Sequence, residues 1–458
     1  MKNINLIFYI LFSGILIPFL FNACSSDATS NSTSTNYSGP LFSLKKSSNT
    51  GLTFENKLNQ SGELNVLRYT YYLNGGGNEF NPNSNNLQDR LYVNQGNGKF
   101  SKSNYALPSM ITSGSTVLTS DFNGDGQPDL FVGGRMKPAN YPIPSKSHIL
   151  IQQNGKFLDK TEEYAPELSN IGLITDAIVE DIDGDGIDDL IVVGEWMSIR
   201  IFKNTKSNLV DITPDNISAE TGWWNSIAKG DFDNDGDMDF AVGNLGLNYK
   251  YNASQTAPFH IYSGDFDNSG NLDIVLSYED KKTGIAYPVR GRECSSQQIP
   301  SITEKFPTYR SFAMATVDDI YGEALQNAYH LQATNFATCI MMNNGSGQFE
   351  LKKLPAEAQV SSTNAFIIED FDGDKKLDIL LAGNLFASEV ETPRNDAGVG
   401  LLLLGKGDGT FDPQSVETSG FFSNKDTKDL QLINNAKLGK SILVANNNDK
   451  LQIFSVLK

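Results

Sequence analysis

The chain has few positive charges and few of the residues that enzymes most often use for catalysis. Its 458 residues include 36 lysines and arginines against 54 aspartates and glutamates, with 3 histidines and 3 cysteines, and the formal net charge is −18 at pH 7. No basic patch is present and the net charge would repel phosphate, which excludes nucleic acid as a partner. No nucleophile motif, zinc signature or phosphate-binding loop occurs either. These absences favour a non-catalytic protein, although they do not decide the question.

Acidic residues are instead concentrated in five short loops of nearly the same sequence. The loops begin at residues 121, 181, 231, 265 and 370, and each places oxygen-bearing side chains at positions one, three, five and nine. Ca²⁺ binds about six to eight oxygens, and a tightly wound loop with this spacing supplies most of them, with the backbone carbonyl of position seven as a further ligand. A single copy would be an ordinary solvated Asp-Gly turn, but five matched copies indicate calcium sites.

We predict three to five structural Ca²⁺ ions, because two of the loops depart from the pattern. Serine stands at position five of the fourth loop (Ser269), and lysine replaces glycine at position six of the fifth (Lys375). Glycine at that position allows the positive φ of a sharp turn without a Cβ clash. The predicted ligands, at positions one, three, five, seven and nine, are Asp121, Asn123, Asp125, Gln127 and Asp129; Asp181, Asp183, Asp185, Ile187 and Asp189; Asp231, Asp233, Asp235, Asp237 and Asp239; Asp265, Asp267, Ser269, Asn271 and Asp273; and Asp370, Asp372, Asp374, Lys376 and Asp378.

The loops are not EF-hands, since they lack the glutamate and the helices of that motif. Position twelve of an EF-hand is a bidentate glutamate, but it is Val132 in the first loop and Val192 in the second. Short aliphatic runs that end in glycine follow the loops, for example at 130–133 and 190–194, and apolar stretches such as 177–179 precede them. These runs are typical of buried strands. Each loop therefore joins two strands.

A second repeated element lies between the loops: a β-hairpin with an Asn/Gly turn and a phenylalanine at the start of its second strand. Copies span residues 91–100, 149–157, 340–349 and 402–411. One unit thus consists of strand, loop, strand and hairpin, which makes four strands in about 45 residues and matches the length of a propeller blade. The sequence predicts an all-β fold, a β-propeller formed by residues 89–458.

The spacing of the loops leaves the number of blades open between seven and six. Successive loops begin 60, 50, 34 and 105 residues apart. Because the last interval is twice a normal one, we expect a blade without a calcium loop inside it, ending at the hairpin of 340–349. A final unit without a loop, at 429–454, closes the chain, and the hairpin of 91–100 is expected to complete the last blade. Counting every unit gives seven blades, which we favour; six result if the third and fourth loops share one blade.

The N-terminus is typical of an export signal. A positively charged start precedes an almost wholly apolar stretch from residue 4 to residue 21, and a small residue stands before Cys24. We interpret 1–23 as a lipoprotein signal peptide, Cys24 as the lipidation site, the Ser/Thr-rich residues 24–40 as a tether and 41–88 as an N-terminal extension. The alternative is an uncleaved membrane anchor, because about eighteen apolar residues just span a bilayer.

The acidic loops, the glycine-ended strands and the Asn-Gly-x-Phe hairpins together resemble the FG-GAP, or VCBS, repeat family over residues 90–456. Members of this family build calcium-bearing β-propellers, and the integrin α-subunit propeller is a relative. The resemblance implies display at the cell surface or in the periplasm and binding of a glycan or a protein partner, with no particular reaction. Further segments are similar to large outer-membrane lipoproteins of Bacteroidetes-type bacteria, namely residues 50–54, 72–77, 222–225, 243–248 and 290–298.

Residues 279–335 break the repeat and are typical of a partly helical insertion, with its helical part at 309–329. Insertions often carry binding function, so we take Arg290 and Arg292 as candidate ligand-binding residues. A cap packed over the rim of the propeller is an equally good interpretation. Packing between blades explains most large aromatic residues, but the tandem pair Trp223 and Trp224 is a further candidate, because neighbours on a strand point to opposite faces and one of the two can then face solvent.

The sequence thus predicts a calcium-stabilised propeller, lipid-anchored to the outer membrane, that binds a glycan or a protein partner without catalysis. Two alternatives stay open: a polysaccharide lyase or hydrolase that uses groups of the insertion such as Glu293, and an accessory subunit of an outer-membrane transport or assembly complex.

His148 and His260 lie in predicted strands and are expected to be buried. Whether Cys294 and Cys339 form a disulfide also stays open, since extracytoplasmic cysteines permit one but the sequence does not bring them together.

Overall fold

The structure is a computed structural model, and its described residues lie within the unit Gly39–Lys458. The predicted signal peptide, the lipidation site Cys24 and most of the tether lie outside the described residues. Within the described part of the chain, no helix has both the length and the apolar character needed to cross a membrane. The described residues are 39–50, 54–55, 83–345, 347–388, 391–435 and 439–457.

Antiparallel sheets make up most of this unit, and in five of them the strands largely follow one another along the chain. Aliphatic strands separated by tight Gly- and Asn-containing turns favour this meander. The five sheets consist of β4 (Gly114–Ser120), β5 (Asp129–Gly134), β6 (His148–Gln153) and β7 (Lys156–Asp159); β8 (Leu173–Glu180), β9 (Asp189–Ser198), β10 (Arg200–Asn204) and β11 (Leu209–Asp211), with β12 (Thr221–Trp223) on β9; β13 (Ser226–Gly230), β14 (Asp239–Gly243), β19 (Cys339–Asn343) and β20 (Phe349–Lys353); β21 (Ala365–Glu369), β22 (Asp378–Ala382), β23 (Leu401–Gly405) and β24 (Phe411–Gln414); and β25 (Thr427–Asn435), β26 (Gly439–Asn446), β27 (Gln452–Val456) and β1 (Phe42–Leu44).

Short elements occupy the connections between these strands. A two-stranded hairpin precedes the first sheet, and single helical turns lie in the loops. They are β2 (Leu91–Asn94), β3 (Phe100–Ser103), α1 (Ser47–Thr50), α2 (Thr161–Tyr164), α3 (Asp215–Ser218), α8 (Val416–Ser419), η1 (Asn85–Leu87), η2 (Pro166–Leu168) and η4 (Ala356–Gln359).

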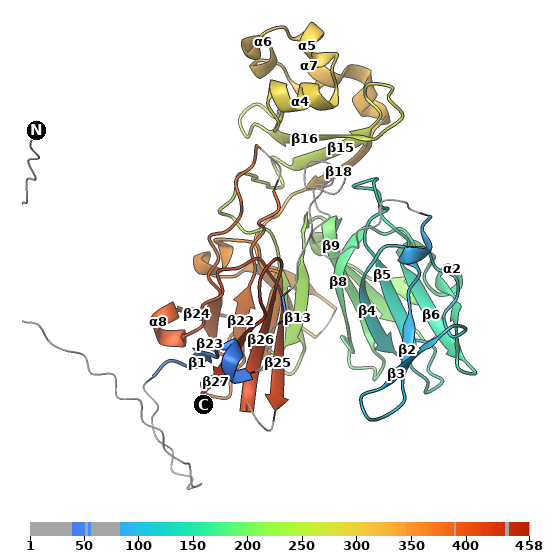
Figure 1. Cartoon of the computed structure of the whole chain (residues 1–458), viewed down its shortest axis with the longest axis vertical. Coiled ribbons are helices and arrows are strands. Elements are labelled where there is room, and N and C mark those ends of the chain that lie inside the picture. Colours follow the sequence, from blue (N-terminus) through green and yellow to red (C-terminus); the bar gives the residue numbers. More distant parts are fainter. Residues whose placement is uncertain are drawn as a thin grey trace, which may run out of the picture. The chain divides into compact units, whose positions relative to one another are not determined.

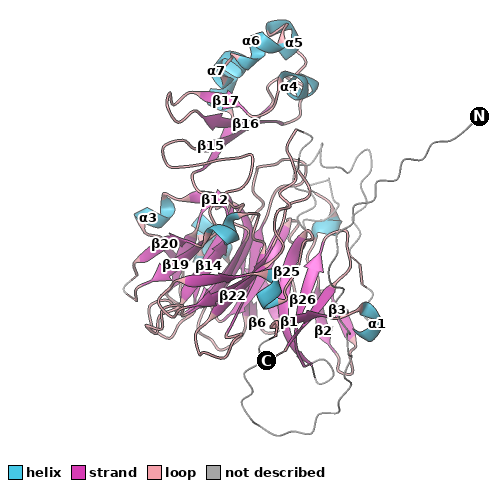
Figure 2. Cartoon of the chain, turned by 90° about the vertical axis from the view of Figure 1, so that its left-hand side faces the viewer, coloured by secondary structure: helices cyan, strands magenta, loops and turns pink. Residues whose placement is uncertain are grey.

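The first strands of successive sheets lie next to one another, β4 against β8, β8 against β13, β13 against β21 and β21 against β25. Neighbouring sheets share an apolar core, such as the one in which Phe131 and Ile149 meet Leu190 and Val192. Sheets that pack face to face in succession, with their first strands innermost and a core on either side, are the architecture of a β-propeller. The predicted all-β propeller is therefore confirmed (Figures 1 and 2).

The last sheet is completed by the N-terminal strand β1, which pairs with β27. Phe42 of β1 is 1% exposed, and its ring packs edge-on against Phe371 and Phe421. The expectation that the hairpin of 91–100 completes this sheet is wrong, because among the described residues β2 and β3 pair only with each other. A strand of three residues carries too short a pattern to stand out in a sequence, whereas burial in a core fixes its place.

Residues 244–338, between β14 and β19, form a separate sheet with a helical cap, which is larger than the predicted insertion of 279–335. We call the five successive sheets the ring sheets. Figure 1 shows the inserted sheet and its helices beyond the ends of the strands of these ring sheets. The helix expected at 309–329 is present as α6, α7 and η3; a short connection separates α6 from α7, and η3 follows α7 directly. The elements are β15 (Phe259–Gly264), β16 (Asp273–Glu279), β17 (Ala286–Pro288), β18 (Tyr329–Ala333), α4 (Arg292–Gln298), α5 (Ile302–Lys305), α6 (Tyr309–Ala313), α7 (Val317–Tyr321) and η3 (Gly322–Asn327).

The strand after the insertion, β19, pairs with β14, so the hairpin of 340–349 belongs to the sheet of the third acidic loop. The expected blade without a calcium loop is therefore not a separate sheet, and the fourth acidic loop lies in the inserted sheet. Pairing across a long insertion, as between Phe240 and Met341, leaves no local signal in the sequence. This removes two of the units counted toward seven blades, and the third and fourth loops do not share one blade as the count of six requires. The total stays a prediction, because 51–53 and 56–82 lie outside the described residues.

Candidate calcium sites and binding surfaces

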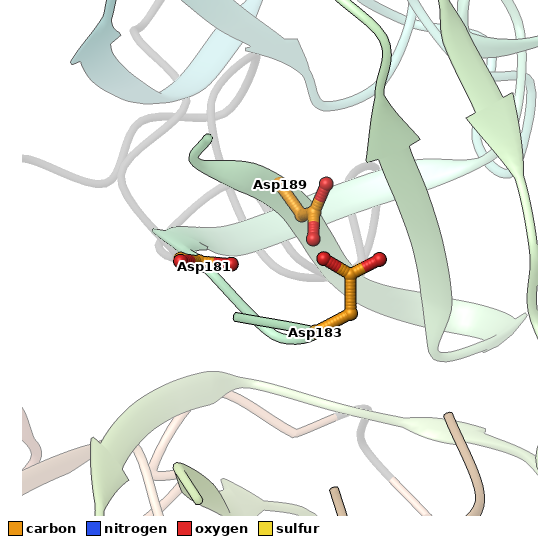
Figure 3. Close-up of side chains that lie close together, drawn as sticks. All are labelled: Asp181, Asp183 and Asp189. Atoms are coloured by element: carbon orange, nitrogen blue, oxygen red, sulfur yellow. The ribbon is translucent and has the colours of Figure 1, made fainter. Parts of the chain in front are cut away.

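Each acidic loop joins two adjacent strands, and in four of the five loops three carboxylates converge. In the second loop, Asp181, Asp183 and Asp189 each place one carboxylate oxygen within 4.8 Å of the others (Figure 3). Three other loops bring three carboxylates together in the same way, whereas the first loop has Asn123 in place of an acid at position three. Several converging carboxylate oxygens are the donor set that suits Ca²⁺. The other three clusters are Asp231, Asp233 and Asp239; Asp265, Asp267 and Asp273; and Asp370, Asp372 and Asp374.

Hydrogen bonds from the backbone to the carboxylate of position one define the shape of the loops. In the first loop, Asp121 accepts the backbone N–H of Asp125 at 3.0 Å and that of Gly126 at 2.8 Å. The same two bonds recur in the other four loops. Gly126 has a φ of 81°, which glycine adopts without strain, and Lys375 adopts the same turn in the fifth loop with a φ of 69°. The departure at Lys375 therefore leaves the loop backbone unchanged.

The carboxylate of position nine has a structural task that the sequence did not reveal. Asp189 is fully buried and accepts the N–H of Ile182 within its own loop at 3.4 Å and the N–H of Asn204 on β10 at 2.7 Å. Asp129, Asp239 and Asp378 make the equivalent pair of bonds. Through these hydrogen bonds, the aspartate at position nine connects each loop of the ring sheets to the third strand of its sheet or to the end of that strand.

Burial of these carboxylates makes their ionised form costly. Desolvation raises the pKa of Asp189, Asp239 and Asp378 to about 6, even though two backbone N–H groups favour the charged form of each. A divalent cation at the loop would offset this cost, because an opposite charge within a few ångströms favours ionised carboxylates. The electrostatics of the ring loops therefore fit a bound cation.

Lysine side chains approach the carboxylates of two loops. Lys203 on β10 pairs with Asp183 and with Asp185, the second at 3.0 Å. Lys376, at position seven of the fifth loop, pairs with Asp374 at 3.0 Å. Hydrogen bonds from these lysines lower the pKa of Asp185 and Asp374. An ammonium at this place competes with a metal ion, so the second and fifth loops suit a bound cation less well than the third.

The tandem tryptophans do not face solvent, and that expectation is wrong. Trp223 is 3% exposed and Trp224 is fully buried. The indole N–H of Trp224 donates to the carbonyl of Met197 at 3.0 Å, and its ring lies in the core between the second and third ring sheets. Trp223 points the other way, into an aromatic cluster with the inserted sheet. The two rings lie on opposite faces as predicted, with Trp223 at the end of β12 and Trp224 directly after it, but both faces are covered.

This aromatic cluster packs the inserted sheet onto the ring. Trp196 and Trp223 have ring centroids 4.9 Å apart, Trp196 stacks on Phe259 of β15 at 5.8 Å, and Trp223 meets Phe336 at 5.4 Å. Large aromatic rings in edge-on and stacked contacts are among the strongest apolar contacts in protein cores. The insertion is therefore mounted on the ring through a buried interface.

A polar network at the same place fixes the orientation of Trp196. Arg135 and Glu195 form an ion pair that is almost fully buried. The hydroxyl of Tyr141 donates to the second oxygen of Glu195 at 3.1 Å and accepts the indole N–H of Trp196 at 2.5 Å. Burial, followed by the neighbouring charge of Glu195, raises the pKa of Tyr141 well above its usual value, which keeps the hydroxyl protonated as a donor. Buried groups satisfied in this way favour one arrangement of the interface.

The two candidate arginines are engaged inside the helical cap. Arg290 donates from Nη1 to Gln298 Oε1 at 2.8 Å and, more weakly, to the carbonyl of Ile274 at 3.4 Å. Arg292 donates from Nε to the carbonyl of Phe306 at 2.6 Å, and its guanidinium lies 5.4 Å from the ring centre of Tyr309. These contacts hold α4 against the rest of the cap. A role of the two arginines in ligand binding stays a prediction.

The two cysteines of the described chain, Cys294 and Cys339, do not form a disulfide. Cys294 lies on α4 of the cap, whereas Cys339 begins β19 and is 1% exposed. Burial raises the pKa of the Cys339 thiol to about 12, so this group is an inert core residue.

A polar cleft of about 340 Å³ lies between loops of the two last ring sheets. The guanidinium of Arg394 lies 5.3 Å over the ring of Phe386 at one side, and Lys425 pairs with Asp449 at 2.8 Å at the other. Sequence reasoning missed this cleft, because its residues come from three connections and form no repeated motif. The lining residues are Phe386, Ala387, Arg394, Asn424, Lys425, Asp426, Asn447, Asn448 and Asp449.

The histidines are not as scattered as the sequence suggests. His148 and His260 lie in strands and are buried, as predicted, and His148 pairs with Asp159 at 2.9 Å. The pairing of β15 with β18 brings His260 next to His330, with Nδ1 and Nε2 respectively 3.0 Å apart. Burial lowers the pKa of both imidazoles, so both are neutral at pH 7.

The comparisons with known proteins agree with the repeats. Residues 69–132 and 181–242 match the model of the FG-GAP-like repeat, so the chain contains repeats of this kind. No curated protein matches the chain significantly. The fold and the matched repeats together define a β-propeller that carries FG-GAP-like repeats.

Several solved structures align over most of the chain at low identity. A lectin of Agrocybe aegerita that recognises non-reducing terminal N-acetylglucosamine is 14% identical over 76% of this chain and 80% of its own, with a TM-score of 0.27. The biofilm matrix protein Bap1 of V. cholerae is 8% identical, covering 75% of this chain and 69% of that one, with a TM-score of 0.29. The Dos1 propeller is 8% identical over 76% and 78%, with a TM-score of 0.24. Since these scores are below 0.5, the propeller assignment rests on the sheets and the repeats.

Proposed function

We propose that this protein is a calcium-stabilised propeller that binds a glycan or a protein partner at the cell surface, without catalysis, and is held at the outer membrane by a lipid on Cys24. The observation that carries the calcium part is the recurrence of one loop geometry, with a buried carboxylate at position nine and converging carboxylates beside it, in successive sheets. Calcium bound there would hold each loop against the third strand of its sheet.

The partner-binding part is supported by the way the chain departs from a plain ring. The insertion of residues 244–338 is mounted on the ring through a buried aromatic interface, so it presents a fixed surface. The polar cleft adds amide and charged groups beside an aromatic ring. Clefts with a few convergent polar groups are where ligands most often bind, and sugars suit such groups because each hydroxyl both donates and accepts.

Calcium removal tests the first part. Ligands that bind only the folded state stabilise it by mass action, by about 2.7 kcal/mol per site at a hundredfold excess over Kd. We expect the melting temperature to fall by several degrees in EDTA and to recover with added Ca²⁺ but less fully with Mg²⁺. An identical melt with EDTA and with millimolar Ca²⁺ would exclude structural calcium.

A binding screen tests the second part. Purified protein is applied to a glycan array in calcium and is also used as bait in native outer-membrane extracts. The variant Arg394→Ala alters the cleft, and Lys281→Ala, at an exposed turn of the inserted sheet, is the matched control. Loss of a bound glycan or protein with Arg394→Ala but not with Lys281→Ala places binding in the cleft. If new reducing or unsaturated ends accumulate in the presence of polysaccharides, the protein is an enzyme and the proposal fails.

A further inference from the structure

Two histidines on neighbouring strands of the inserted sheet face each other. His260 on β15 and His330 on β18 place Nδ1 and Nε2, respectively, 3.0 Å apart. In the pairing of these strands, His330 lies opposite Tyr262, the residue two positions after His260. Residues two apart on a strand share a face, so the two histidines occupy diagonal positions on the same face of the sheet. The register of β15 and β18 thus brings one nitrogen of each imidazole within hydrogen-bond distance of the other.

A carboxylate fixes the tautomer of the inner histidine. Glu279 Oε1, at the end of β16, lies 3.0 Å from His260 Nε2. An ionised carboxylate only accepts hydrogen bonds, so Nε2 carries the proton and Nδ1 presents its lone pair toward His330. A carboxylate behind the distal nitrogen of a histidine is a common arrangement around bound metals, because it orients the ring and makes the ligating nitrogen more basic.

The outer histidine is held in place by stacking. The ring of Tyr262 lies 4.4 Å from that of His330, and the two planes differ by 8°. His260 is 5% exposed, whereas His330 is an exposed residue. The pair therefore combines a buried, oriented nitrogen with one at the surface.

From this geometry we propose that His260 and His330 bind one divalent transition-metal ion of the zinc and copper class, with His260 Nδ1 and His330 Nε2 as ligands and Glu279 as a positioning residue. Zn–N bonds are about 2.0–2.1 Å long, so tetrahedral ligation separates two nitrogens by roughly 3.3 Å, close to the separation observed here. The chemistry differs from that of the acidic loops, because imidazole nitrogen suits zinc and copper while calcium prefers oxygen. The remaining positions go to water or an incoming ligand.

The sequence contains three histidines, and all of them are described, so each one can be replaced in turn to find which bind the metal. The untagged protein is titrated with Zn²⁺ by calorimetry in millimolar Ca²⁺, which competes with Zn²⁺ for the acidic loops. Bound Cu²⁺ is then examined by electron paramagnetic resonance. The variants are His330→Gln, which alters an exposed side chain, and Glu279→Gln, which removes the charge behind His260. His148→Gln is the control, because His148 lies on a different sheet.

We expect saturable binding of one Zn²⁺ at micromolar concentration and nitrogen hyperfine splitting from two imidazoles on Cu²⁺. His330→Gln should weaken binding at least about 100-fold and remove the splitting of one nitrogen, while Glu279→Gln should weaken binding about 10–100-fold. His148→Gln should leave both readouts unchanged. The site is refuted if the wild-type protein binds no Zn²⁺ below millimolar concentration, if His330→Gln binds like the wild type, or if copper shows oxygen ligands only. Equal affinity in Glu279→Gln would remove Glu279 from the proposal.

Discussion

The buried carboxylate of Asp239 accepts the backbone N–H of Asn343 at 2.8 Å, although the whole insertion separates these residues in the chain. Its other oxygen accepts the N–H of Phe232 at 3.0 Å. The side-chain amide of Asn343 in turn donates to the carbonyl of Ile182 in the second acidic loop at 3.3 Å. One carboxylate therefore joins the third loop to the strand that follows the insertion, and Asn343 extends the link to the neighbouring sheet.

Replacing Asp239 with alanine should destabilise the protein severely even when calcium is saturating. The change leaves two buried N–H groups without an acceptor, at a cost of about 1–3 kcal/mol for each. We expect urea unfolding in millimolar Ca²⁺ to show a loss of about 2–5 kcal/mol. Asp237→Asn is the control, because position seven would contribute its backbone carbonyl rather than its side chain. Equal losses in the two variants would contradict the structural task of position nine.

The fourth acidic loop should stabilise the helical cap rather than the ring sheets. Asp273 accepts the N–H of Phe266 at 3.0 Å, and the ring of Phe266 packs against the cap helices and lies 5.4 Å from that of Tyr321. With Asp265→Asn, we expect faster hydrogen exchange in residues 292–327 and unchanged exchange in the ring strands.

The matched variant for this experiment is Asp370→Asn, at the same position of the fifth loop. It should increase exchange in β21 and β22 and leave the cap unchanged. If Asp265→Asn and Asp370→Asn produced the same exchange pattern, the fourth loop would not be coupled specifically to the cap.

Tryptophan fluorescence should resist quenching in the folded protein. The sequence contains three tryptophans, and Trp196, Trp223 and Trp224 are each at most 3% exposed. Iodide and acrylamide reach buried indoles poorly, so quenching should rise sharply only on unfolding in urea. Efficient iodide quenching of the native protein would show that at least one tryptophan is accessible, as the sequence alone suggested.

Stability should fall as the pH rises through the pKa of Asp176. Burial raises the pKa of this β8 residue from its usual 3.8 to about 6, and the nearby charge of Asp429 on β25 adds to the rise. Since the folded pKa exceeds the unfolded one, the contribution of Asp176 to the free energy of unfolding is fully present below about pH 4 and lost above about pH 6.

The variant Asp176→Asn should therefore flatten the pH dependence between pH 4 and pH 7, measured by urea unfolding in saturating calcium. Asp429→Asn changes an exposed side chain and should flatten it partly, because removing a neighbouring negative charge lowers the pKa of Asp176. A wild-type stability that rises over this range, with no difference in Asp176→Asn, would contradict the assignment.

Local features of this protein were predictable because their interactions span only a few residues. The turn of each acidic loop depends on bonds between positions one, five and six, such as those from Asp125 and Gly126 to Asp121. The strands on either side of the loops follow from short aliphatic runs that end in glycine. These signals were enough to indicate an all-β propeller and the candidate calcium ligands.

The second function of position nine was not predictable, although its residue type was. An aspartate that binds a metal and one that accepts buried N–H groups look the same in a sequence. The partner of Asp239, for example, is Asn343, which lies beyond the insertion. Only the paired strands show that one carboxylate serves the loop and the third strand together.

By itself, the sequence determined the repeated unit: its strands, its turns and the spacing of its carboxylates, all of which depend on contacts within about ten residues. The tertiary structure alone decided which units share a sheet, as β14 does with β19 and β27 with β1. It also buried Trp223 and Trp224 and brought His260 to His330. The reason is physical: strand pairing and core packing join residues that are far apart in the chain, and a pattern in one segment does not encode which distant segment will cover it.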